Sequence, residues 1–124
     1  MIRHLIAGAV GAALILGAAS LFLWSMPVTA AECQTMVASH YGKESGSRTA
    51  SGSFFDGSQM VAAHKTMKFG TRLRVTYKGK SVDVVLRDRG PYIRGRDIDL
   101  STAAARKIGL TKAGVGRVRV CRLG

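Results

Sequence analysis

Two kinds of hydrophobic pattern divide the chain. From Leu5 to Trp24, apolar and small residues run without a charge, whereas after residue 32 short apolar stretches alternate with polar ones. The alternation is strict over 72–77, where Leu73, Val75 and Tyr77 fall on one face and polar residues on the other. A period of two predicts half-buried β-strands. The second part of the chain is therefore expected to be a mainly β domain.

This pattern predicts five strands and one short helix. The strands are expected at 34–41, 61–64, 72–77, 81–86 and 116–123. Lys78 and Gly79 would form the turn of a hairpin between the third and fourth strands. The helix is expected over 101–108, because Ser101 can cap it, three alanines follow, and Arg106 and Lys107 come near its end.

A weak internal repeat indicates how these strands are arranged. The segment 69–75 resembles the segment 115–120, and each follows a short stretch rich in alanine and basic residues. Two related halves in a small β-rich domain favour a closed barrel with pseudo-twofold symmetry. Closure would also remove exposed strand edges.

The N-terminal third has the order of a secretory signal peptide. Arg3 gives a basic start, an apolar run follows, and small residues lead to Ala30 and Ala31. We expect a signal peptide at 1–30, export to the periplasm or the cell exterior, and a folded domain over 34–123. The apolar run is also long enough to span a bilayer, so an uncleaved anchor is the alternative and the only expected link to a membrane.

The two cysteines, Cys33 and Cys121, lie near the two ends of the exported part. In an oxidising compartment such a pair most simply forms a disulfide, which would close nearly the whole domain into one loop. Two free thiols are the alternative. A metal site is weaker, because the cysteine and histidine spacings of metal sites are absent from the sequence.

The exported part is strongly basic. Arg3 is the single cation among residues 1–31, so 18 of the 19 Lys and Arg residues and all seven carboxylates follow it, which gives +11. Such a charge favours polyanionic partners over simple solubilisation. Export and the scarcity of aromatic residues argue against nucleic acid. Anionic polymers of the cell envelope remain.

Several short motifs occur in a specific order along the exported part. They are Ala38-Ser39-His40-Tyr41-Gly42, Thr49-Ala50-Ser51-Gly52, Ala62-Ala63-His64-Lys65-Thr66, Phe69-Gly70-Thr71, Arg87-Asp88-Arg89-Gly90-Pro91 and Ile98-Asp99-Leu100-Ser101. With these motifs the chain resembles the rare lipoprotein A (RlpA-like) family over 38–120. The resemblance implies a six-stranded double-psi β-barrel related to expansins.

The resemblance also implies a reaction. Characterised members look like peptidoglycan lytic transglycosylases, which cut the glycan between N-acetylmuramic acid and N-acetylglucosamine and leave an anhydro end. The 6-hydroxyl of the muramic acid is its own nucleophile, so one well-placed acid can serve the reaction. A monomer without a cofactor or metal is expected, acting on glycan strands in cell wall organisation. A non-catalytic, expansin-like wall-binding module is the alternative.

The resemblance assigns catalysis to Asp88 and assistance to His64. Asp88 follows an apolar run and precedes a Gly-Pro turn, so it would lie where a strand opens into a loop. Arg89, beside it, is expected to contact substrate. The alternative for Asp88 is a structural carboxylate bonded to loop amides and paired with an arginine. The alternative for His64 is a core histidine bonded to backbone.

One position departs from the family pattern. Family members usually have glutamate after Thr-Ala-Ser-Gly, whereas this chain has Ser53, which cannot act as a carboxylate. Glu44, earlier in the same loop, is a candidate replacement. Ser53 is retained as a substrate-contact position. Asp56 would bind sugar hydroxyls or hold the loop.

Aromatic and acidic residues complete the candidates. Tyr41, Phe55 and Tyr92 would stack on sugar rings or pack against the barrel. Asp97 and Asp99 flank Ile98, a poor pattern for a metal site. Asp99 is instead expected to cap the helix or to pair with one of two arginines, Arg94 or Arg96.

Overall fold

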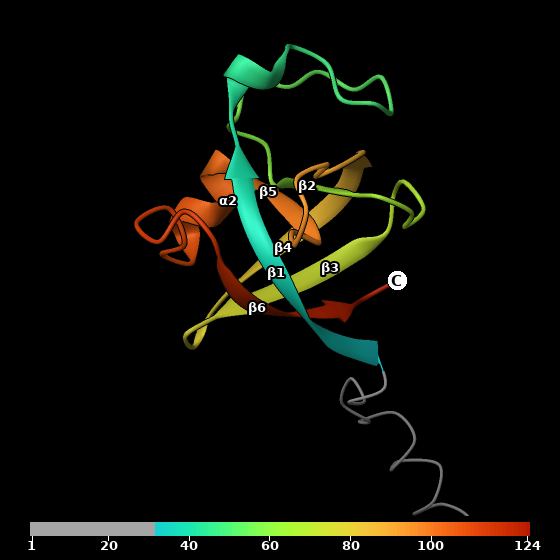
Figure 1. Ribbon diagram of the computed structural model, residues 1–124. Helices are drawn as coiled ribbons and strands as arrows, with labels where there is room; N and C mark the ends of the chain where they lie inside the picture. Colours follow the sequence, from blue (N-terminus) through green and yellow to red (C-terminus); the bar gives the residue numbers. More distant parts are fainter. Residues whose placement is uncertain (1–31) are drawn as a thin grey trace, which may run out of the picture.

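Six strands close into a barrel (Figure 1). The computed structural model describes residues 32–124, so the predicted signal peptide lies outside the described residues. The strands are β1 (Cys33–Tyr41), β2 (Val61–His64), β3 (Arg72–Tyr77), β4 (Lys80–Asp88), β5 (Ile98–Ser101) and β6 (Gly116–Arg122). A 3-10 turn, η2 (Lys43–Ser45), follows β1, and the helix α2 (Thr102–Lys107) follows β5. The predicted barrel with one short helix is confirmed for this part of the chain.

The order around the barrel is β1-β5-β2-β4-β3-β6, with β6 returning to β1. The pairs β1–β5 and β2–β4 are parallel, and the other four are antiparallel. The predicted hairpin joins β3 to β4. Lys78 and Gly79 both have positive φ, as a two-residue turn of type I′ requires. Every other neighbouring pair joins strands that are distant in sequence.

The strand alternation fills the barrel as predicted. Leu73 and Val75 on β3 and Val118 and Val120 on β6 are buried, and they pack in one cluster with residues from all six strands and α2. Tyr77 is partly buried against the same cluster. Burial of this apolar surface is the main favourable term in the folding of the domain.

β5 is the strand that the sequence analysis missed. Its four residues alternate, with Ile98 and Leu100 buried in the core. The helix begins one residue later than expected, and Ser101 is confirmed as its cap: Ser101 Oγ accepts a hydrogen bond from the Ala104 N–H at 3.2 Å. Ser101 also donates to the Gln59 carbonyl at 2.6 Å, which ties the loop before β2 to the helix.

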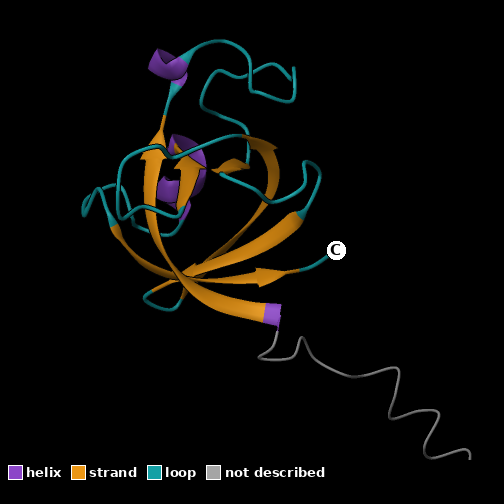
Figure 2. Ribbon diagram, turned by 45° about the vertical axis from the view of Figure 1, so that its right-hand side comes forward, coloured by secondary structure: helices purple, strands orange, loops and turns teal. Residues whose placement is uncertain are grey.

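The connection from β1 to β2, residues 42–60, arches over the end of the barrel where β1 finishes (Figures 1 and 2). It is anchored by a second small apolar cluster in which Phe55 packs on Tyr41 and Ala63. Long loops of this kind are usually functional. Within residues 32–124, the structure contains no helix long and apolar enough to cross a membrane.

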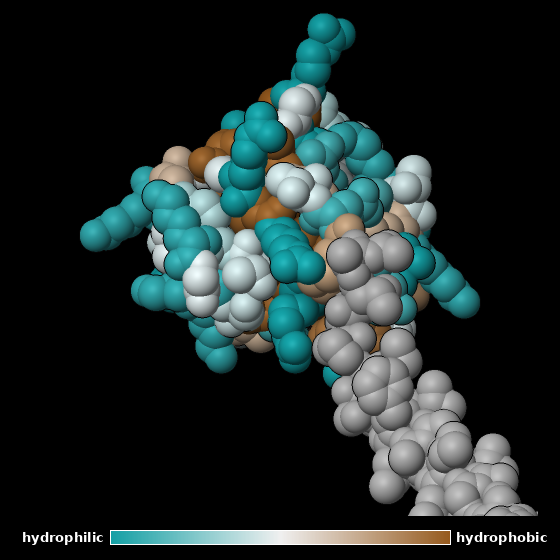
Figure 3. Space-filling model, turned by 90° about the horizontal axis from the view of Figure 1, so that it is seen from below, coloured by the Kyte–Doolittle hydropathy of each residue, from teal (hydrophilic) through white to brown (hydrophobic). Residues whose placement is uncertain are grey.

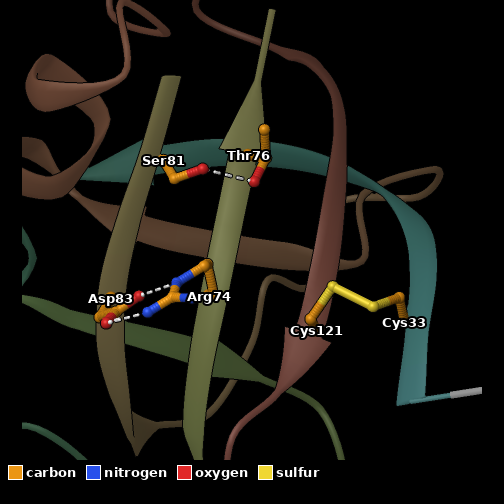
Figure 4. Close-up of a disulfide and its surroundings, with 6 residues drawn as sticks. All are labelled: Cys33, Arg74, Thr76, Ser81, Asp83 and Cys121. Carbon is orange, nitrogen blue, oxygen red and sulfur yellow. Dashed lines mark hydrogen bonds and ion pairs between the residues drawn. A yellow bond between two sulfur atoms is a disulfide. The ribbon is translucent and has the colours of Figure 1, made fainter. Parts of the chain in front are cut away.

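The face of the barrel seen from below is mostly polar (Figure 3). Viewed from below, hydrophilic side chains project from most of the face, with apolar atoms visible between them (Figure 3). The first and last strands meet on the barrel wall, and there the predicted disulfide joins Cys33 of β1 to Cys121 of β6 (Figure 4). The bond is confirmed, and it fastens together two strands whose cysteines are 88 residues apart in the chain.

Candidate active site

Two carboxylates share one row across the outer face of the barrel. Ala63 on β2 pairs in register with Asp99 on β5 on one side and with Asp88 on β4 on the other. Ser39 on β1 extends the row, because it pairs with Asp99. The Cα atoms of the two aspartates are therefore two strand spacings apart, roughly 9–10 Å. Only the methyl group of Ala63 separates them along the row.

A register shift in the β2–β4 pair brings Asp88 into this row. Ala62 pairs with Leu86, but the next residue, Ala63, pairs with Asp88 and skips Arg87. Leu86 is fully buried in the core, so strict alternation along β4 would turn Asp88 inward as well. The shift places Asp88 beside Ala63 on the outer face instead. Irregularities of this kind re-aim side chains next to active sites.

Backbone amides hold the Asp88 carboxylate. Its Oδ1 accepts hydrogen bonds from the Ala50 N–H at 2.8 Å and from the Arg89 N–H at 2.9 Å. The turn that contains Ala50 is itself bonded to β4, because the Ser51 N–H donates to the Arg87 carbonyl at 3.0 Å. Among the described residues, the single ion pair is that of Arg74 with Asp83. Asp88 is thus held by loop amides without being neutralised by an arginine.

Asp99 is the functional candidate whose role the sequence analysis assigned wrongly. It lies in β5 and does not cap the helix, and in the described part of the chain it forms no ion pair with Arg94 or Arg96. Its Oδ1 accepts a hydrogen bond from Ser39 Oγ at 3.0 Å. Burial raises the pKa of Asp99 above its usual range, and the Asp88 charge adds to the rise, while Ser39 and the positive charges of His40 and Arg96 oppose it. A carboxyl group with a raised pKa suits a proton donor.

Tyr41 interacts electrostatically with both carboxylates. Its ring is 8% exposed and stacks on Phe55 with the centroids 4.9 Å apart, so that face is not open to a sugar. Its hydroxyl is buried and has no hydrogen bond of ordinary geometry. Burial first, then the charges of Asp88 and Asp99, raise the pKa of Tyr41 well above the usual tyrosine range. A contact between the Tyr41 hydroxyl and the Asp88 carboxylate, longer or less well aligned than an ordinary hydrogen bond, adds to this rise. Tyr41 is therefore a neutral hydroxyl with an unused donor.

A cleft of about 300 Å³ opens over this row. The cleft is lined by Tyr41 and by the four residues of the row, which are Ser39, Asp99, Ala63 and Asp88. Its rim is formed by the loop after β4 and by three arginines: Arg48, Arg89 and Arg96. Tyr92 and Ile93 lie on the rim, and the Tyr92 side chain is 79% exposed. Asp88 is partly buried and lines this cleft.

His64 lies outside the cleft lining. Its Nδ1 accepts hydrogen bonds from the Thr66 N–H at 3.1 Å and the Met67 N–H at 3.0 Å, so the proton of the neutral ring is on Nε2. Burial first, then Lys65 and Arg89, lower the pKa of His64, and Asp97 opposes them. His64 and Asp88 are not hydrogen-bonded to each other in the described chain. The histidine organises the turn after β2.

Arg89 supports that same turn from the cleft side. Its guanidinium donates to the Met67 carbonyl at 2.8 Å and to the His64 carbonyl at 3.3 Å, and it lies 3.9 Å from the centre of the Phe69 ring. Asp56 is exposed and lies outside the cleft lining. Its carboxylate accepts from the backbone N–H and hydroxyl of Ser58, which lower the Asp56 pKa. This geometry fits a loop-holding role.

A larger cavity, of about 660 Å³, lies where β1 begins and β6 ends. Glu32 is the single carboxylate side chain in its lining, and neither Asp88 nor Asp99 reaches it. The smaller cleft, which is lined by two carboxylates, is therefore the better candidate for an active site. Within residues 32–124, no group of three His, Cys, Asp or Glu side chains is arranged to hold a metal ion.

Comparison with known proteins places the barrel in a family. The family described as lytic transglycolase matches residues 33–120, nearly all of the described chain. The chain belongs to this family. The lytic transglycolase barrel seen here is the double-psi β-barrel that the motifs implied.

Among curated relatives, a probable endolytic peptidoglycan transglycosylase RlpA from Nostoc sp. is 50% identical over 93 residues, which cover 71% of this chain and 25% of that protein. The endolytic peptidoglycan transglycosylase RlpA of Pasteurella multocida is 47% identical over 87 residues, covering 68% and 30%. The chain spans about a quarter to a third of the length of the curated relatives it matches.

Two solved structures share the fold. The Streptomyces papain inhibitor superposes with a TM-score of 0.64 at 23% identity, covering 81% of this chain and 100% of that one. An expansin from Clavibacter michiganensis gives 0.61 at 20% identity, covering 74% and 50%. At these identities the likeness concerns the fold alone.

Ser53, the position where the resemblance expects glutamate, does not line the cleft. Its hydroxyl bonds to Thr49 Oγ1 at 2.7 Å inside the turn that holds Asp88. Glu44 is not a replacement in this lytic transglycolase barrel: it is exposed and outside the cleft lining, and its carboxylate accepts from the Gly42 N–H of its own turn. Asp99 is the second carboxylate of the cleft.

Proposed function

We propose that this protein is a peptidoglycan lytic transglycosylase that cleaves glycan strands between N-acetylmuramic acid and N-acetylglucosamine. The observation that carries the proposal is the pair Asp88 and Asp99, in one row beneath an open cleft and separated by Ala63. Family membership and the names of the relatives support the same activity.

The two carboxyl groups take different roles. Asp99, whose protonated form is favoured by burial, gives its proton to the glycosidic oxygen as the bond from that oxygen to C1 of the muramic acid breaks. Asp88, oriented by the Ala50 and Arg89 amides, accepts the proton of the muramic acid 6-hydroxyl as its oxygen bonds to C1. One bond breaks and one forms within the substrate, and no water is consumed.

The intramolecular nucleophile explains how a site without the family glutamate can work. A 6-hydroxyl in the same sugar has a high effective molarity, so the enzyme need not bind and activate a water molecule. After product release, one proton returns from Asp88 to Asp99 through solvent. Tyr92 and Ile93 on the rim supply apolar surface against which a sugar ring can rest.

The cellular setting follows from the same proposal. Residues 1–30 act as a signal peptide, and the folded domain works in the periplasm or at the cell exterior. The Cys33–Cys121 disulfide supports an oxidising compartment. Peptidoglycan glycan strands are the partner, and the domain acts on them as a monomer.

Digestion of purified peptidoglycan sacculi tests the activity. The wild-type domain should release products with anhydromuramic ends, detected by mass spectrometry, from intact sacculi or from sacculi stripped of stem peptides. Asp88→Asn should abolish the release, because the amide cannot take the proton. Asp56→Asn is the matched control, since Asp56 is an exposed carboxylate outside the cleft. Equal release by wild type and Asp88→Asn would overturn the proposal.

A second candidate function is a non-catalytic wall-binding module. Ser53 favours it, because this chain lacks the carboxylate that the family usually places there. In that case the wild type and Asp88→Asn would both pellet with sacculi and neither would release anhydromuramic products.

A further inference from the structure

A cationic face lies on the side of the barrel away from the cleft. We define it as four arginines, Arg72 and Arg74 on β3 and Arg117 and Arg119 on β6. All four are exposed, and they alternate with the buried residues of their strands. In the closed order of strands, β3 stands three places from β5, and β6 stands three places from β2. The face is therefore opposite the strands that carry Asp99 and Ala63.

The rows of this face are rich in hydrogen-bond donors (Figure 4). Arg119 pairs in register with Thr35 on β1 and with Thr76 on β3, and Thr76 pairs with Ser81 on β4. The next row holds the disulfide, then Arg74, then Asp83. Guanidinium groups thus lie among hydroxyl groups, and both bind oxyanions.

Most of this positive charge is not used by the fold. Within residues 32–124, Asp83 is the one carboxylate side chain bonded to an arginine side chain of the face, through two hydrogen bonds with Arg74 at 2.8 and 3.1 Å. In the described chain, the side chains of Arg72, Arg117 and Arg119 form no ion pair. Arg117 and Arg119 are two residues apart on one strand, about 7 Å. Like charges this close repel each other, and a bound polyanion would relieve the repulsion.

The chemistry of the face selects the partner. Arginine binds carboxylates through two parallel N–H donors. Among residues 32–124, the exposed large apolar side chains are Phe54, Tyr92, Ile93 and Val115, and none is on β3 or β6. A surface that docks on a lipid bilayer usually inserts such groups, so a lipid partner fits poorly.

We propose that the cationic face binds the carboxylates of peptidoglycan stem peptides, so that the barrel rests on one part of the wall while the cleft holds a glycan strand. The choice of partner rests on the proposed function, because the same polymer supplies the glycan for the cleft and the carboxylates for the face. The opposed positions of face and cleft allow both contacts at once.

Co-sedimentation with sacculi tests the docking surface. Each protein carries Asp88→Asn, so that no digestion occurs, and is mixed with intact sacculi or with sacculi from which an amidase has removed the stem peptides. The test variant is Arg117→Gln with Arg119→Gln. The matched control is Arg106→Gln with Lys107→Gln, two exposed cations on α2. Circular dichroism verifies that both variants are folded.

The face variant should bind intact sacculi at least fivefold more weakly than the control at low salt, and the difference should shrink at high salt. On stripped sacculi the two variants should bind equally. Equal binding to intact sacculi, or an equal loss on both kinds of sacculi, would overturn the proposal. The same proteins are also sedimented with phosphatidylglycerol vesicles. If the face variant loses binding to the vesicles but not to sacculi, the proposal is overturned in favour of a membrane partner.

The result of the co-sedimentation test does not depend on catalysis. With Asp88 restored, the face variant should release anhydromuramic products from soluble stripped glycan at a rate within twofold of wild type. If the wild type releases none, the proposed activity fails, while the sedimentation result still decides whether the face binds stem peptides.

Discussion

Asp88 and Asp99 occupy the same row of the barrel, on either side of Ala63. The first is held by backbone amides, and the second is partly buried and bonded to the Ser39 hydroxyl. Two carboxyl groups in unlike environments are a common basis for dividing acid and base roles. Substitutions at these positions separate catalytic roles from structural ones.

Asp99→Asn should lower the rate of anhydromuramic product release by at least about 100-fold, because general acid catalysis typically contributes that much. Binding to sacculi should change little, since the amide keeps the shape of the side chain and can still accept from Ser39. Product release is measured by mass spectrometry and binding by co-sedimentation. Retained activity with normal binding would remove Asp99 from the mechanism.

The same substitution should change how stability depends on pH. The pKa of Asp99 is raised in the folded state, so the folded protein holds this proton at pH values where the unfolded chain has lost it. The free energy of unfolding therefore falls as pH rises from about 4 through the raised pKa. Asp99→Asn should have a higher Tm than wild type at pH 7, and the two should converge at pH 4. A lower Tm at pH 7 would indicate a structural carboxylate instead.

Tyr41→Phe tests the unpartnered hydroxyl. Removing a buried hydroxyl that has no partner should change the free energy of unfolding by less than about 1 kcal/mol. We expect product release to fall about tenfold, because the hydroxyl lies among the cleft residues and is free to donate to Asp88 or to substrate once the cleft is filled. Urea unfolding and product release are measured together. Strong destabilisation with unchanged activity would make Tyr41 a packing residue only.

The disulfide should contribute mainly to stability. Cys33→Ser with Cys121→Ser should lower the free energy of unfolding by about 2–4 kcal/mol, because the bond closes a long loop of the unfolded chain. Urea unfolding of the variant, and of the wild type with and without a reductant, measures the effect. At urea concentrations just below its unfolding midpoint, the variant should release anhydromuramic products at the wild-type rate per folded molecule. The reason is that the cysteines are outside the cleft.

Local patterns predicted most of the fold. The strict alternation at 72–77 and the two-residue turn at Lys78 and Gly79 depend on neighbours in sequence, and both are confirmed. β5 was missed because its four residues directly precede the helix, so its polar residues were interpreted as capping and pairing groups. The alternation of Ile98 and Leu100 was the signal that could have identified it.

The site was less predictable than the fold. Family resemblance selected Asp88, but the row that joins it to Asp99 depends on pairing between strands that are distant in sequence. The packing of Tyr41 on Phe55 likewise depends on how the 42–60 loop folds back, which local sequence does not specify.

The register shift at Ala63 has a consequence for redesign of this domain. A variant with one residue inserted between Ala62 and Ala63 would pair that residue with Arg87 and make the ladder between β2 and β4 regular. Strict alternation along β4 would then turn the Asp88 carboxyl group toward the hydrophobic interior. The register between β2 and β4 is therefore as important to any chemistry here as the identity of the acid. A variant selected only for a more regular sheet would keep this acid in its sequence and remove it from the cleft.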